Sequence, residues 1–198
     1  MKQIKAIAAT VAGVLVMVSG TAVVSAITTT TTISSVVSPV ITLFSSNGTV
    51  NINALPTGGG VQTIASDTVT VSTNDASGYT LQLNETSGSS ALVSGGNSIP
   101  ATAGTFGTPI PEAVNTWGYR VDSLGTFGAG PTNSASNAAI SGSIKFAAVP
   151  ATASPQTLKT TATTASSDTT AVWYGVAVNT TQASGTYTNG VTYTATAN

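Results

Sequence analysis

The stretch TVTVSTNDASGYTLQLNE, residues 68–85, decides the fold class of this chain. Apolar side chains alternate with polar ones before and after its centre, and a period of two places one set on a buried face and the other in water. The central residues 74–78 suit a tight turn, because Asn and Asp bond their own backbone and glycine tolerates positive φ. We therefore expect two strands that form the central hairpin of an all-β domain.

The rest of the chain carries the same kind of signal. Residues 170–178, TAVWYGVAV, are apolar on both faces, which is typical of a central strand. Residues 186–197 alternate threonine with apolar side chains, a pattern that suits a half-exposed strand. Shorter candidate strands are residues 36–44, 49–53, 91–93, 98–101, 115–121, 144–149 and 157–163. Pro39 lies inside the first of them and cannot donate a backbone hydrogen bond, so we expect that strand at a sheet edge or a bulge. About eight to ten short strands predict an immunoglobulin-like or jelly-roll-type β-sandwich.

The N-terminus has the features of a secretory signal peptide, residues 1–26. Two lysines precede an apolar stretch over residues 7–18, and Val24-Ser25-Ala26 matches a small-x-small cleavage site. We expect a signal-peptide helix with cleavage after Ala26. An uncleaved membrane anchor is the alternative, since residues 6–24 are about long enough to span a bilayer. A Thr-rich flexible leader over residues 27–35 and a single sandwich domain over residues 36–198 are expected to follow.

Composition excludes several classes of function. Only 6% of the residues are charged and the chain contains no Cys and no His, so disulfides, thiolate metal sites, thiol catalysis and His-based triads are ruled out. After removal of residues 1–26, six acidic side chains face three basic ones, a net charge of −3. This balance argues against nucleic acid as a partner and against electrostatic membrane binding, so a membrane contact is expected only through an uncleaved signal segment. No cofactor is expected.

Two passages together resemble the secreted β-sandwich surface domains of bacteria, of which the WxL-type cell-wall-binding domain is the best known. They are VTVSTNDASGYTLQL at residues 69–83 and YGVAVNTTQASGTYTNGVTYTATAN at residues 174–198. Tyr79-Thr80-Leu81 and Tyr193-Thr194-Ala195 stand where such domains carry Trp-x-Leu, although neither is a true Trp-x-Leu. The resemblance implies a location at the bacterial cell surface or cell wall and contact with wall polymer.

Four aromatic residues lie close together in two candidate strands: Trp117, Tyr119, Trp173 and Tyr174. Such side chains bind sugars when they form an exposed platform, and anchor the core of a sandwich when they are buried. We expect Tyr119 and Tyr174 to lie inside, and we retain Trp117, Tyr119 and Trp173 as a possible binding surface. The row Thr192-x-Thr194-x-Thr196 resembles an ice-binding face, but an ordinary exposed sheet face explains it better.

The acidic residues suggest two further kinds of site. Glu85 and Glu112 are the only Glu residues, and glycoside hydrolysis needs a pair of carboxylates; scattered solubilising charges are the expected explanation. Asp67, Asn74 and Asp75 have oxygen ligands for Ca²⁺, but an Asx turn is favoured because calcium needs more ligands than these three supply.

These observations favour a secreted, non-catalytic module at a bacterial cell surface or wall that acts by adhesion or structure. Its expected partners are cell-wall polymer, other surface proteins or further copies of itself. The alternative is a filament subunit in which residues 33–44, with the Thr-rich leader before them, complete a neighbour's sheet by strand addition. A glycan-active enzyme is a remote third possibility.

Overall fold

The computed structural model describes residues 27–130 and 134–198, and these residues contain strands and loops but no helix. The predicted signal-peptide helix and the cleavage site at Ala26 lie outside the described residues. A compact unit spans Val37–Asn198, and the described residues before Val37 are extended and exposed. In the described part of the chain, no helix is long and apolar enough to cross a bilayer.

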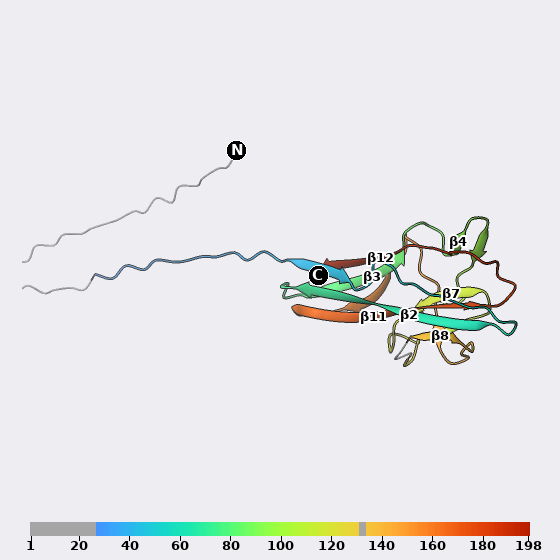
Figure 1. Ribbon diagram of the computed structural model, residues 1–198. Helices are drawn as coiled ribbons and strands as arrows, with labels where there is room; N and C mark the ends of the chain where they lie inside the picture. Colours follow the sequence, from blue (N-terminus) through green and yellow to red (C-terminus); the bar gives the residue numbers. More distant parts are fainter. Residues whose placement is uncertain (1–26, 131–133) are drawn as a thin grey trace, which may run out of the picture. The chain divides into compact units, whose positions relative to one another are not determined.

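Two antiparallel sheets form the two layers of the compact unit (Figure 1). The first sheet has β11 at its centre, and the second has β3 between two partners. The first contains β1 (Ile41–Ser45), β2 (Val61–Thr73), β7 (Thr116–Arg120), β8 (Ala135–Ala138) and β11 (Ala165–Val178), and the second contains β3 (Tyr79–Glu85), β10 (Gln156–Thr160) and β12 (Val191–Ala197). Two short pairs join β4 (Leu92–Ser94) to β5 (Asn97–Ile99) and β6 (Ile110–Pro111) to β9 (Lys145–Phe146). The prediction of an all-β sandwich is confirmed.

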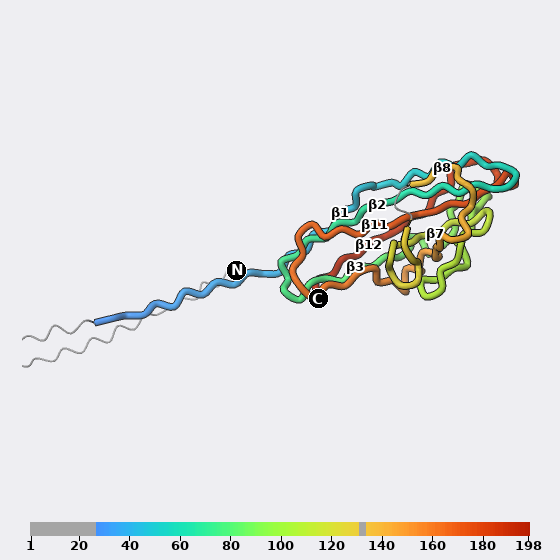
Figure 2. The backbone as a smooth tube through the Cα atoms, turned by 90° about the horizontal axis from the view of Figure 1, so that it is seen from below, coloured from blue at the N-terminus to red at the C-terminus, as the bar shows by residue number. Residues whose placement is uncertain are grey.

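The predicted central hairpin is wrong in its pairing. β2 and β3 flank the turn at residues 74–78 as expected, but they belong to different sheets. β2 pairs with β11 from Val61 to Thr73, and Figure 2 shows these two strands side by side. The chain therefore crosses from one layer to the other at the turn. Alternation shows which face of a strand is buried but not which strand lies beside it, so a hairpin and a crossing between layers share one sequence pattern.

The crossing brings two apolar faces together. Val69 and Val71 on β2 and the side chains of Tyr79, Leu81 and Leu83 on β3 are all fully buried in one core cluster. Deep burial of each such side chain contributes about 1.5–3 kcal/mol. The packing of these five side chains between the sheets thus holds the two layers together.

Gly78 is required where the chain enters β3. Its φ is +84°, and a Cβ atom there would collide with the backbone carbonyl of Thr161. The turn itself is closed by Asp75, whose Oδ1 accepts a hydrogen bond from the Ser77 N–H at 2.8 Å. The Asx turn that the sequence favoured over a calcium site is present.

A hydrogen bond and an ion pair to Asp168 also link the two layers. The Tyr79 hydroxyl on β3 donates to Asp168 Oδ2 on β11 at 2.8 Å, and Lys159 Nζ on β10 lies 2.5 Å from Asp168 Oδ1. Burial acts to raise the pKa of Asp168, but the hydrogen bonds from Lys159 and Tyr79 outweigh it and hold that pKa below its ordinary value. The carboxylate is therefore ionised at neutral pH.

Two further strand predictions differ from the structure. Residues 49–53 form no strand, although Val50 and Ile52 point their side chains against the core. The strand predicted at residues 36–44 is β1, which begins only at Ile41, after Pro39. β1 lies at the edge of its sheet, as the proline predicts. β11 is a central strand, as its two apolar faces predict.

Candidate functional site

The predicted aromatic surface is divided between two sides of the first sheet. Trp117 and Tyr119 on β7 lie in the main core and are 3% and 0% exposed. Trp173 on β11 is 8% exposed and packs on the other side with Ile64 and Phe146. The three side chains are buried and do not form one exposed platform. Tyr119 and Tyr174 lie inside the protein, as the sequence led us to expect.

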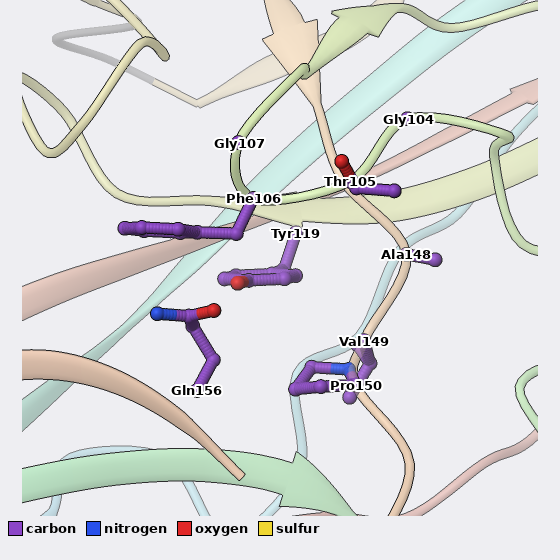
Figure 3. Close-up of a pocket in the computed structure, with 9 residues that line it drawn as sticks. All are labelled: Gly104, Thr105, Phe106, Gly107, Tyr119, Ala148, Val149, Pro150 and Gln156. Atoms are coloured by element: carbon purple, nitrogen blue, oxygen red, sulfur yellow. The ribbon is translucent and has the colours of Figure 1, made fainter. Parts of the chain in front are cut away.

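A small pocket of about 360 Å³ reaches the ring of Tyr119. Figure 3 shows Phe106, Tyr119 and Gln156 gathered on one side of it and Pro150 on another. The Tyr119 hydroxyl has no hydrogen-bond partner among the described residues. None of the residues that line the pocket carries a charge at neutral pH, so the lining offers a packing surface without an acid or a base.

The two glutamates have separate surroundings. Glu112 is 4% exposed, and its Oε2 accepts a hydrogen bond from Gln62 Nε2 on β2 at 2.6 Å. Burial raises the pKa of Glu112 to about 8, although hydrogen bonds from Gln62 and from the Gly118 backbone act against this rise. Glu85 is buried at the end of β3, where its backbone carbonyl accepts from the Thr152 hydroxyl. Each glutamate is embedded in the framework of the fold.

The candidate calcium ligands hold loops in place. Asp67 accepts hydrogen bonds from the Ser45 and Ser46 hydroxyls at 2.6 and 2.9 Å and from the Asn47 N–H at 3.0 Å. Asn74 Oδ1 accepts from the Val40 N–H at 2.6 Å, which fastens the chain just before β1. Within residues 27–130 and 134–198, no group of three or more acidic side chains is placed to hold a metal ion.

A second hollow is a groove of about 890 Å³ where the edges of the two sheets open. One wall is residues 47–54 after β1, and the other is residues 182–193, which lead into β12. Its floor consists of core side chains that are otherwise sealed between the layers: Trp117, Tyr174, Val176 and Val178, with Leu92 and Ile99 beside them. The groove therefore opens onto the hydrophobic core itself.

The walls of the groove have little charge. The Tyr174 and Tyr193 hydroxyls lie 2.7 Å apart and bond each other, which satisfies two polar groups in an apolar setting. Asp67 is the only charged residue of the lining, and its oxygens are occupied by the Ser45, Ser46 and Asn47 groups. Such a surface suits an uncharged segment of chain.

Sequence reasoning missed this groove and also missed Arg120. Arg120 on β7 is fully buried; its Nη2 lies 2.9 Å from Asp122 Oδ1 and 3.0 Å from the Gly128 carbonyl. Arg120 follows Tyr119 directly in the strand NTWGYRV, so alternation predicts that the two side chains point to opposite faces of the sheet. Alternation does not show that the face with Arg120 is also buried. A lone basic residue among apolar neighbours was the available signal.

We compared the chain with protein-family models, with curated proteins and with solved structures, and no match was found in any of the three. The class that the fold defines is an all-β sandwich with several antiparallel sheets.

Proposed function

We propose that this chain is a non-catalytic structural or binding module, secreted and displayed at a bacterial cell surface or wall. The low content of charged residues supports this location, together with the secretory features of residues 1–26. The carboxylates of Asp67, Asp75 and Glu112 bond to loop and framework groups, which supports a role in structure for these three. The module would act through contacts of its surface with wall polymer, another surface protein or a second copy.

One observation favours a second copy as the partner. The residues before β1 expose large apolar side chains to water: Ile33 and Val36 are each 90% exposed, and Val37 is 79% exposed. Apolar side chains so fully exposed in one short segment are a mark of an interaction surface. We infer that this segment joins copies of the protein into a filament by strand addition. The glycan-active enzyme finds no such support.

Fractionation of cells followed by a binding assay tests the proposal. The protein is expected outside the cytoplasm, and the purified exported chain is expected to be retained on beads that carry the same chain. Beads that carry purified wall polymer serve as the parallel arm. Retention on wall polymer alone would keep the surface module but reject the filament. Retention on neither kind of bead would reject both wall polymer and a second copy as partners, and a cytoplasmic location would reject the proposal as a whole.

A further inference from the structure

The segment that projects before β1, here called the arm, is residues 27–37, ITTTTTISSVV. Isoleucine, threonine and valine are β-branched and favour strands, yet the arm takes part in no β-ladder among the described residues. In an extended conformation Ile33 and Val37 lie on the same face, with Ser34 and Val36 on the other. The arm therefore has the composition of a β-strand but is not paired with any strand among the described residues.

The C-terminal end of the arm is attached at a fixed point of the sandwich. Asn74 Nδ2 donates to the Ser38 carbonyl at 3.1 Å, and its Oδ1 accepts from the Val40 N–H, so residues 38–40 are held beside the end of β2. Residues 41–45 are paired in their own sheet as β1. The part of the chain available to another molecule therefore ends near Val37, before the residues 38–44 that the sequence included in the donor.

The groove lacks a strand between its two walls. Residues 49–54 on one wall turn Val50, Ile52 and Ala54 toward the core in alternation, but they belong to no strand. On the other wall, the ladder of β12 is formed with β3, and the described residues provide no strand on the opposite edge of β12. An extended segment placed between these walls would extend the sheet edge and lie over the core side chains that form the floor of the groove.

We propose that the arm of one molecule adds as a strand in the groove of a second copy, between residues 49–54 and 187–193, with Ile33 and Val37 directed at the core. This inference rests on the proposed assembly by strand addition and names its donor and its acceptor. The arm carries no charged residue, and the groove is lined by apolar side chains, uncharged polar side chains and one fully bonded aspartate. Both surfaces therefore combine apolar and uncharged polar groups and carry little charge.

The direction of the chain favours a second copy over the arm's own groove. β1 runs from Ile41 beside Thr73 to Ser45 beside Val69, so the chain enters at the Thr73 end of β2. The groove lies along the part of β11 that pairs toward Val61, at the other end of β2. At ~3.3 Å per residue, residues 27–37 reach about 36 Å, enough to fill a neighbour's groove. A donor at one end and an acceptor at the other give an open head-to-tail chain.

Cysteine cross-linking tests the assignment, because the chain has no cysteine of its own. One preparation carries Ile33→Cys or Val37→Cys in the arm, and the other carries Val191→Cys at the groove. Mixed and oxidised, the two should form disulfide-linked heterodimers, since a bridge needs Cα atoms about 4.4–6.8 Å apart. Ser136→Cys on exposed β8 is the matched acceptor control and should cross-link at least tenfold less.

The outcomes separate the inference from the proposed function. If the chains associate by light scattering but cross-link no better at residue 191 than at residue 136, the groove is not the acceptor and the assembly itself stands. If they do not associate at all, both are rejected. A peptide of residues 27–40 added to the unmodified chain provides a second measurement that needs no groove variant. It should reduce association, whereas the same peptide with Ile33→Asn and Val37→Asn should not; equal effects of the two peptides would overturn the assignment.

Discussion

Replacement of Arg120 with methionine is expected to lower the free energy of unfolding by about 1–3 kcal/mol, the cost of leaving buried hydrogen-bond acceptors without their donor. The guanidinium is fully buried and donates to Asp122 Oδ1 and to the carbonyls of Lys145 and Gly128 at 3.0–3.3 Å. Methionine fills a similar volume but leaves these acceptors without their donor. Urea denaturation followed by circular dichroism measures the difference.

Asp122→Asn is the companion to the Arg120 variant. Asparagine keeps an oxygen that accepts from the guanidinium but removes the charge that offsets the buried cation, so it is expected to lower the free energy of unfolding by at least as much as Arg120→Met. A loss below 1 kcal/mol for Arg120→Met would contradict the structural role assigned to Arg120. It would mean that water replaces the guanidinium at the two carbonyls.

Replacement of Glu112 with glutamine is expected to make the protein more stable at high pH. The pKa of Glu112 is raised by burial to about 8 in the folded protein, against an ordinary value near 4.5. The unfolded chain therefore loses this proton first, and the free energy of unfolding falls as pH rises from about 4.5 to about 8. The difference between the two pKa values corresponds to about 4–5 kcal/mol at pH 8 and above.

Urea denaturation of the Glu112 variant and the parent protein at several pH values measures this effect. The two should have similar stability below pH 4.5, and the variant should exceed the parent by an amount that grows up to pH 8. Glu112→Asp keeps a titrating carboxyl beside Gln62 and should keep the fall in stability with pH. A constant difference between Glu112→Gln and the parent across the series would show that the carboxyl does not titrate in this range.

The local sequence pattern predicted where strands form better than which strands pair with each other. The alternation in residues 68–85 identified β3, the inward-facing Val69 and Val71 of β2 and the suitability of Gly78 for the turn, because these follow from the backbone of one segment; it did not show that β2 begins at Val61. It could not show that β2 and β3 lie in different sheets, since that depends on β11 and β12 far along the chain. The apolar faces of residues 170–178 succeeded because a central strand is buried on both sides.

The groove was beyond the reach of the sequence for a related reason. Its floor side chains, such as Tyr174 and Val176, read as ordinary core, and only the arrangement of residues 47–54 and 182–193 leaves them accessible. The segment before β1 was recognised as a possible donor from its composition. Its limit at Val37 was not, because that limit is set by the hydrogen bonds of Asn74, more than thirty positions away.

Sedimentation velocity over a series of concentrations tests the central claim most directly. Three chains are compared: residues 27–198, residues 38–198, and residues 27–198 with Ile33→Asn and Val37→Asn. The account predicts species that grow with concentration for the unmodified residues 27–198 and a monomer at every concentration for both variants. A monomer in all three samples, or equal growth in all three, would contradict it.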